Sequence, residues 1–351
     1  MSRFTDAFPV PRFLAMPAVG LSLTDEAVRF VQFDIYRNKV RLARFGTKPL
    51  PPGTIRFGEI KDAPALITVL KELQKEYGLS FVRTALPEEK AYLFDVTTPY
   101  TPETNIQDAV AFKLEENVPL SPDQVVFGSH IIGGDEVLKK NPNTLDIAVS
   151  VYPADMISMY TEVLQTAGLQ PISFEIESQA IARAVVEKSN FQDLLIINIR
   201  PEKTEFYIVS SKLVRFSSNV TIGTMSLFES VSGEQQKRAG GQKQIEPPLQ
   251  RQNLTALIHE AQKLFSYWQT YKHGSQQTSS IQSVVVCGLG STHERLVRML
   301  GENLGVPATA GNVWANAFSL DEYIPPITFE ESINYTSAIG LALPEGDYRY
   351  A

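Results

Sequence analysis

The sequence predicts a duplicated α/β fold with a cleft between two related halves. Near the N-terminus, three strand-like segments are followed by a helix and a further strand, and the same order recurs after residue 190. A supersecondary unit that occurs twice indicates two copies of one architecture in a single chain. At about 150 residues per domain, the 351 residues also allow more than one domain and a large core.

The composition excludes several classes of protein. Hydrophobic residues at 43% and charged residues at 20% are typical of a globular chain. The formal net charge of 32 − 39 = −7 argues against nucleic acid as a partner, because nucleic-acid binding needs a basic surface. A single cysteine, Cys287, excludes a disulfide scaffold, and the four scattered histidines predict no metal site. No apolar run approaches the roughly 18 residues of a membrane helix, and no signal peptide is present, so we expect a cytoplasmic protein.

In the first half, residues 1–16 are expected to form a tail, and the elements begin after it. Strands are predicted over 17–23, 27–34 and 39–45, the second and third of them from alternating apolar residues. Apolar residues at helical spacing between Leu66 and Tyr77 predict a helix that ends at Gly78, and a strand follows over 80–86.

In the second half the order is the same. Strands are predicted over 194–199, 204–209 and 212–216, a long helix between Leu254 and Tyr271, and a strand over 283–287. The Gln- and Gly-rich stretch 230–252 predicts a loop, and 344–351 a polar C-terminal tail.

Between the halves lies a segment that the second copy lacks. Residues 91–177 predict strand, helix, two strands, helix and strand, which together would form a self-contained β-α-β-β-α-β subdomain. The expected division is therefore a first lobe of 17–90 and 178–190, an inserted subdomain of 91–177, and a second lobe of 191–343.

Several segments in this order resemble one protein family. They are Val19-Gly20-Leu21-Ser22-Leu23, Leu86-Pro87-Glu88, the run from Phe112 to Ser121, the run from Glu175 to Ala184, Val284 to Gly290, Gly305-Val306-Pro307, and Thr336 to Ala342. The chain is similar to the actin-like ATPase superfamily and, within it, to the type IV pilus assembly protein PilM family and its relative FtsA. The resemblance implies a two-lobed actin-like (ribonuclease H-like) fold with a nucleotide cleft.

At both phosphate hairpins the chain departs from the pattern of that superfamily. Members carry an Asp on the first strand and a Gly at the turn, because carboxylates organise hydrated Mg²⁺ and a glycine turn brings backbone N–H groups to phosphate. Here Ser22 and Thr24 occupy these places in the first hairpin, and Asn198 and Arg200 in the second. The resemblance therefore implies no catalytic residue, no metal ligand and no hydrolysis of ATP.

Binding of ATP without turnover stays open, because Arg29 or Arg200 could neutralise phosphate; a cleft filled by side chains is the alternative. The positions that the resemblance assigns to nucleotide are Gly20, Ser22, Thr24, Asn198, Arg200, Thr204, Gly288 and Gly290. In place of the small subdomain that helps to hold the base, the chain has the 230–252 loop.

For function, the resemblance implies a scaffold of the type IV pilus, or a related secretion system, on the cytoplasmic side of the inner membrane. Its partner would be the N-terminal peptide of a bitopic inner-membrane protein, PilN, bound at the junction of the insertion and the first lobe. Other pilus inner-membrane proteins and self-association are further expected contacts. An active ATPase or sugar kinase is disfavoured by the missing carboxylates, and an FtsA-like division protein by the polar C-terminus. A Rossmann dinucleotide site is disfavoured because His293 stands where the third glycine belongs.

Overall fold

The computed structural model describes residues 19–36, 39–101, 104–134, 137–138, 143–228, 248–271 and 280–343. The predicted tails at 1–16 and 344–351, and all but the last few residues of the 230–252 loop, lie outside this range. Residues 251 and 252 of that predicted loop instead begin a helix.

Two five-stranded sheets share one strand order, which confirms the predicted duplication. The first sheet runs β10-β6-β1-β2-β3 and the second β13-β12-β11-β14-β15, so each follows the order fifth, fourth, first, second, third or its reverse. The first contains β1 (Val19–Leu23), β2 (Ala27–Tyr36), β3 (Lys39–Pro49), β6 (Phe81–Leu86) and β10 (Gln170–Ile176). The second contains β11 (Leu194–Ile199), β12 (Thr204–Ser210), β13 (Leu213–Val220), β14 (Ser283–Gly288) and β15 (Ala308–Ala310).

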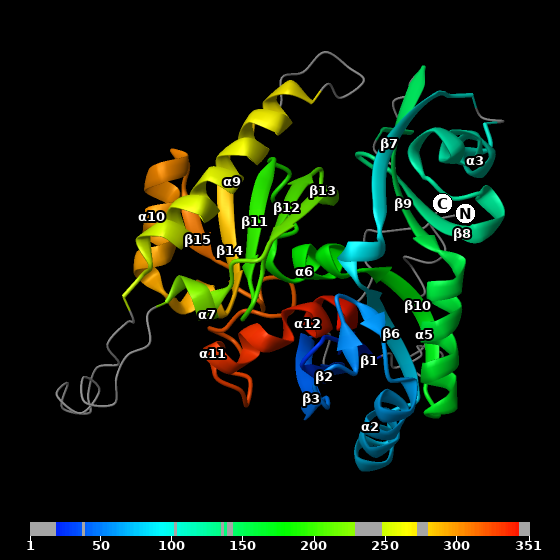
Figure 1. The fold of residues 1–351 in the computed structure, drawn as a ribbon, viewed down its shortest axis with the longest axis vertical. Coiled ribbons are helices and arrows are strands. Elements are labelled where there is room, and N and C mark those ends of the chain that lie inside the picture. Colours follow the sequence, from blue (N-terminus) through cyan, green and yellow to red (C-terminus); the bar gives the residue numbers. More distant parts are fainter. Residues whose placement is uncertain are drawn as a thin grey trace.

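Helices cover both faces of each sheet (Figure 1). The main helices are α2 (Ala63–Tyr77), α5 (Ala154–Thr166), α6 (Glu177–Val185), α9 (Arg251–Thr270), α10 (Glu294–Leu304) and α12 (Thr336–Ala342). Although α12 comes last in the chain, it packs against β1, β2 and β6 of the first sheet. Helices α2 and α5 pack on the outer face of the first sheet and α9 and α10 on that of the second, whereas α6 and α12 share a core between the sheets. All six residues of β11 are buried because both of its faces are covered.

Two glycines allow the central helices to pack closely. A Cβ at Gly340 of α12 would lie 1.8 Å from the carbonyl oxygen of Ala180 in α6. A Cβ at Gly20 of β1 would lie 2.1 Å from the carbonyl oxygen of Ala338 in α12. Backbone therefore packs directly against backbone at the centre of the molecule.

The inserted subdomain is shorter than predicted. It consists of β7 (Tyr92–Pro99), α3 (Ile106–Asn117), β8 (Val125–Ile131) and β9 (Thr144–Pro153), in a three-stranded sheet of order β7-β9-β8. The predicted last strand, β10, instead pairs with β6 of the first lobe, and Val163 and Leu164 of α5 join the core of that lobe. The expectation of a self-contained unit over 91–177 is therefore wrong in its last third, because the sequence order does not reveal with which sheet a strand pairs.

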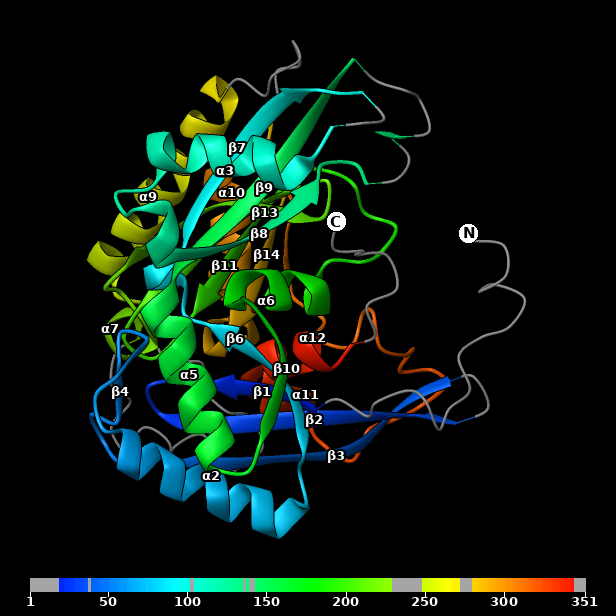
Figure 2. The same ribbon diagram turned by 90° about the vertical axis from the view of Figure 1, so that its right-hand side faces the viewer.

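The inserted sheet has one covered and one open face. Alternate residues of its strands, among them Val96, Ile147 and Val149, pack against Val110 and Leu114 of α3. Figure 2 shows the other face lying above α6, with the first-lobe sheet below that helix.

A buried ion pair fixes the insertion to the second lobe. Asp95 of β7 accepts a hydrogen bond from Arg215 Nε of β13 at 2.9 Å, and a second guanidinium nitrogen pairs with the same carboxylate. The hydroxyl of Tyr271, at the end of α9, donates to Asp95 Oδ2 at 2.9 Å.

Short strands and α-helices that were not predicted also lie in the described part of the chain. They are β4 (Ile55–Arg56), β5 (Glu59–Ile60), α7 (Thr224–Leu227) and α11 (Phe329–Ser332).

Candidate functional site

The cleft between the lobes contains five of the eight positions assigned to nucleotide. These are Ser22, Thr24, Asn198, Arg200 and Gly288, which line one cavity together with Arg29, Glu177 and Ser337. The cavity has a volume of about 70 Å³. Pockets that enclose small ligands usually measure roughly 300–1,000 Å³, so this cavity is smaller than that range.

The other three positions lie outside the cavity lining. Gly20 packs under α12, as described above. A Cβ at Gly290 would lie 2.6 Å from Ile199 Cδ1, so this glycine serves close packing against β11. The hydroxyl of Thr204 donates to the carbonyl oxygen of Ile222 at 2.6 Å and so closes the second-lobe loop.

Neither phosphate hairpin uses left-handed backbone. Among the described residues, the non-glycine residues with positive φ are Phe57, Ser211 and Lys212, and none of them lies in these turns. In the first turn, Thr24 Oγ1 donates to the carbonyl oxygen of Ala27 at 3.0 Å. The turn is therefore closed by a side chain, which explains why it needs no glycine.

Arg29 also faces the cleft from β2. Its guanidinium donates to Thr24 Oγ1 at 3.3 Å. Burial lowers the pKa of Arg29, and the positive charge of Arg200 acts in the same direction.

In the second hairpin, the polar side chains converge on the buried carboxylate of Glu205. It accepts hydrogen bonds from Asn198 Nδ2 at 2.8 Å, from Arg200 Nε at 2.9 Å and from the hydroxyl of Tyr207 at 2.7 Å. Lys203 Nζ pairs with its other oxygen at 2.8 Å. Burial alone would raise the pKa of Glu205, but Arg200 and Lys203 outweigh it and lower that pKa to about 2.

The same two cations reach across to the first lobe. Arg200 pairs with Glu177, the first residue of α6, at 2.7 Å, and Lys203 pairs with Glu89, which follows β6. In the second hairpin, both residues that replace the phosphate-binding positions, Asn198 and Arg200, are therefore bonded to carboxylates of the protein itself.

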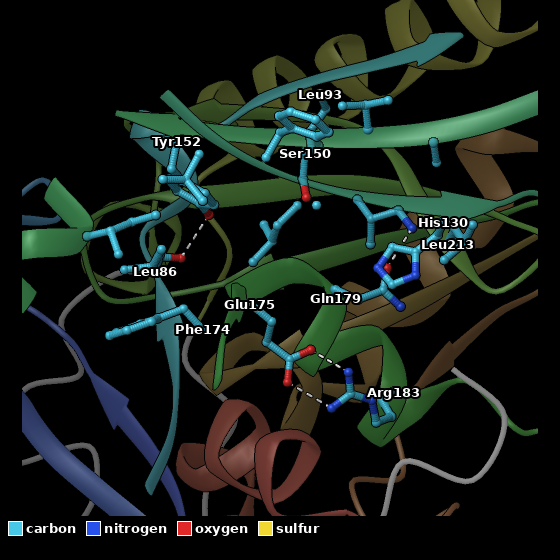
Figure 3. A pocket seen from close by; sticks show the side chains of 18 residues that line it. Leu86, Leu93, His130, Ser150, Tyr152, Phe174, Glu175, Gln179, Arg183 and Leu213 are labelled. Atoms are coloured by element: carbon cyan, nitrogen blue, oxygen red, sulfur yellow. Dashed lines mark hydrogen bonds and ion pairs between the residues drawn. The ribbon is translucent and has the colours of Figure 1, made fainter. Parts of the chain in front are cut away.

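A second and larger cavity, which we call the groove, lies at the junction of the insertion and the first lobe. Its volume is about 300 Å³. Figure 3 shows its side chains between the open face of the inserted sheet and α6. The lining residues are Leu86, Leu93, Val126, Phe127, Gly128, His130, Ala148, Val149, Ser150, Tyr152, Ile157, Phe174, Glu175, Ile176, Gln179, Arg183, Leu213 and Val214.

The charges at the base of the groove neutralise each other. Arg183 Nη1 donates to Glu175 Oε1 at 2.8 Å, and its other terminal nitrogen pairs with the second oxygen of that carboxylate, as Figure 3 shows. Both side chains are buried. The pair therefore presents a floor without net charge beneath mainly apolar walls.

Gln179 and Tyr152 join the walls of the groove. Gln179 Oε1 accepts from the backbone N–H of Val214 at 3.0 Å, and its Nε2 donates to the carbonyl oxygen of Lys212 at 3.1 Å. The hydroxyl of Tyr152 donates to the carbonyl oxygen of Leu86 at 3.3 Å. These hydrogen bonds connect α6 to the second lobe and β9 to the first. The first lobe, the insertion and the second lobe therefore all contribute to the groove.

The sequence indicated the place of the groove but not its residues. The alternation of β8 and β9 predicts which side chains share a face, but the facing elements, β10 and α6, come from elsewhere in the fold. Within the described part of the chain, no helix is long and apolar enough to cross a membrane, and no cluster of residues suits a metal ion.

Comparisons with known proteins agree with this architecture. A solved structure described as the PilM–PilN type IV pilus biogenesis complex is similar, with 21% identity, a TM-score of 0.71, and coverage of 95% of this chain and 98% of that chain. The ethanolamine utilization protein EutJ from Carboxydothermus hydrogenoformans is more distant, with 14% identity, a TM-score of 0.47, and coverage of 95% and 90%. No match was found among curated proteins. A family model for type IV pilus assembly protein PilM matches residues 20–345, so the chain belongs to the PilM family, with an actin-like ATPase fold.

Proposed function

We propose that this chain is a cytoplasmic scaffold of the type IV pilus inner-membrane complex, and that its groove binds the N-terminal peptide of a PilN-like bitopic membrane protein. The observation that carries the proposal is the groove itself, a cavity of about 300 Å³ at the junction where the insertion meets the first lobe. Membership of the PilM family and the likeness to a structure described as a PilM–PilN complex support the identity of the partner.

The groove has the features that an extended peptide requires. Its walls carry apolar side chains such as Leu93, Phe174 and Leu213, which can receive alternate side chains of a strand. Among the described strands, β8 pairs with β9 alone, so its other edge offers backbone groups to an added strand. A bound membrane protein would then hold this chain at the cytoplasmic face of the inner membrane, where other pilus proteins or a second copy could join it.

A blocked groove tests this proposal. A synthetic peptide from the N-terminus of the PilN-like partner is expected to bind the full chain one-to-one in calorimetry. Ser150→Trp puts a large side chain into the groove, and we expect it to weaken binding by at least about tenfold, or about 1.4 kcal/mol.

Phe112→Ser is the matched control, because Phe112 is 77% exposed on α3, which covers the opposite face of the inserted sheet. Equal peptide affinity for Ser150→Trp and the wild type would place the site elsewhere. Point substitution is preferable to removal of 91–177, because such a deletion would also remove β10 from the first-lobe sheet.

We further propose that the cleft does not hydrolyse ATP. Ser22 and Asn198 supply no charge to a magnesium shell, and Arg200 and Lys203 already pair with carboxylates of the protein. Even with Ser22→Asp and Asn198→Asp together we expect no activity, because a carboxylate at 198 would face Glu205.

Turnover of Mg-ATP by the full chain should equal that of Leu289→Trp, in which a larger side chain covers the mouth of the cleft from a position that is 40% exposed. Magnesium-dependent phosphate release above that control would contradict the proposal.

A further inference from the structure

Two short segments of the first lobe take part in both the cleft and the groove. Leu86 lines the groove, and Glu89, three residues later, pairs with Lys203 in the cleft. Glu175 and Ile176 line the groove, and Glu177, the next residue, pairs with Arg200. The wall of the groove is thus one or a few residues away from the ion pairs of the cleft.

These ion pairs cross from one lobe to the other. Glu89 and Glu177 belong to the first lobe, whereas Arg200 and Lys203 belong to the β11–β12 turn of the second. Both cations are held on their own lobe by Glu205, with distances of 2.9 Å and 2.8 Å. Glu205 is only 3% exposed and accepts further hydrogen bonds from Asn198 and Tyr207. It therefore holds both cations in place on the second lobe, independently of their contacts with the first lobe.

All five charged side chains are shielded from solvent. The side chain of Glu205 is 4% exposed, and those of Arg200 and Glu177 are 20% and 12% exposed. Lys203 and Glu89 are 23% and 20% exposed. Ion pairs in such surroundings are weakly screened, and removing one partner leaves a poorly solvated charge.

We infer that Arg200 and Lys203, with Glu177 and Glu89, form a latch that holds the two lobes closed without nucleotide. The chain's own side chains then make the connection across the cleft that a bound phosphate would otherwise make. A second consequence rests on the function proposed above: by fixing Glu89 and Glu177, the latch positions the wall of the groove for the peptide. These four side chains are positioning residues, and none of them lines the groove.

The distance between the lobes is the direct test. Spin labels on Lys71→Cys of α2 and Glu302→Cys of α10 would report it, since both native side chains are exposed. The native Cys287 is buried, and burial raises the pKa of its thiol to about 12, so it reacts slowly with the label.

In the full chain we expect a narrow distance distribution that Mg-ATP leaves unchanged. The double variant Glu89→Gln/Glu177→Gln removes both first-lobe partners of the latch and keeps the cations on Glu205. It should broaden the distribution and shift it to longer distances. Glu89→Asp/Glu177→Asp keeps the charges and should stay closed, and Glu260→Gln, which breaks an exposed pair with Lys263, is the control.

Three outcomes would overturn the latch: a distribution for Glu89→Gln/Glu177→Gln that matches the wild type, equal opening of the Asp variant, or narrowing of the wild-type distribution by Mg-ATP. The affinity for the partner peptide should fall about tenfold in Glu89→Gln/Glu177→Gln and stay unchanged in Glu89→Asp/Glu177→Asp. If the wild type binds no peptide, the proposed function fails, and the distance measurement still decides the latch. Circular dichroism of each variant confirms that it is folded before the distance or the peptide affinity is measured.

Discussion

Glu88 and Glu205 are two buried carboxylates at the junction of the lobes whose surroundings differ. Glu88 Oε2 accepts a hydrogen bond from the backbone N–H of Ser178 at 3.3 Å, and no hydrogen-bond partner of Oε1 lies among the described residues. Burial raises the pKa of Glu88 to about 7, although the nearby hydroxyls of Ser178 and Ser217 act in the opposite direction. Glu205 is also buried, but two cations lower its pKa. The neighbouring charge, and not burial alone, therefore decides the ionisation state of each.

The raised pKa of Glu88 predicts a dependence of stability on pH. Between pH 4.5, the ordinary value of the carboxyl, and about pH 7, the folded chain binds this proton more tightly than the unfolded chain. The free energy of unfolding should therefore fall as the pH rises through this interval. Glu88→Gln removes the ionisable group, and at pH 8 we expect it to raise the free energy of unfolding by roughly 1–3 kcal/mol.

Urea denaturation at pH 4 and pH 8 measures this effect, with Glu115→Gln on the exposed face of α3 as the control. The difference between Glu88→Gln and the wild type should be far smaller at pH 4 than at pH 8. A difference that is the same at both pH values would show that Glu88 does not titrate in this range.

Among the elements, helices α6 and α12 join the two lobes through the closest backbone packing described above. Gly340 lies against Ala180, and Gly20 against Ala338. Because α12 lies between α6 and β1, a displacement at this contact would disturb both lobes at once.

Replacement of Gly340 tests the importance of this contact. In an exposed helix, Gly→Ala usually stabilises by about 1 kcal/mol. Here we expect Gly340→Ala to lower the free energy of unfolding by about 3 kcal/mol or more, because the new methyl group would overlap the backbone of α6. Thermal unfolding would measure this loss of stability, with Thr68→Ala at an exposed position of α2 as the control. A Gly340→Ala protein more stable than the wild type would show that α6 and α12 can move apart without cost.

Local patterns explain which elements could be predicted from the sequence. Strand alternation and helical spacing gave nearly every strand and helix of the first lobe and the insertion, and the Gly78 end of α2 has the left-handed backbone expected there. The resemblance implied a closing strand at Gly305-Val306-Pro307, next to β15, but helix α10 was missed, although Leu296, Leu300 and Gly305 carry the signal of a helix with a glycine end. With α10 and β15 included, the two lobes repeat each other in full.

Tertiary contacts explain what could not be predicted. The strand β10 has an ordinary strand sequence, and nothing in it shows that it pairs with β6 and not with the inserted sheet. For the candidate site, the turn positions Thr24 and Arg200 were placed in the cleft because a hairpin turn is a local feature. Gly20 was assigned to nucleotide because its contact with α12, some 320 residues later, is not visible in the sequence.

For the whole molecule, the position of the insertion depends on polar contacts with the second lobe. Asp95 receives both Arg215 and the hydroxyl of Tyr271, and the side chain of Arg215 is 4% exposed. Burial and the charge of Asp95 raise the pKa of Tyr271 above its ordinary range, so the phenol stays a hydrogen-bond donor. The insertion is thus held from both sides, by the first lobe through its chain connections and by the second through this cluster.

Loss of the Asp95 charge should loosen that attachment. Asp95→Asn leaves Arg215 buried without its counter-ion, and we expect the free energy of unfolding to fall by about 3 kcal/mol. Hydrogen exchange should also become faster in β7 and β13, which lie on the two sides of the contact. Asp146→Asn is the control, because Asp146 bonds Thr97 on the exposed part of the same sheet. Unchanged exchange in β13 would mean that the ion pair does not hold the insertion in place.

The register of the inserted sheet has a consequence for how this part of the chain can change. Tyr92, at the start of β7, is the cross-strand partner of Val151, near the end of β9, so the two chain crossings into the insertion lie side by side. Cα atoms of paired antiparallel residues are only about 5 Å apart. The chain therefore leaves and re-enters the first lobe at two adjacent points, and their separation does not depend on the residues inserted between them. A domain of different size or binding specificity can therefore replace the insertion at this position without a change in the course of the first-lobe sheet.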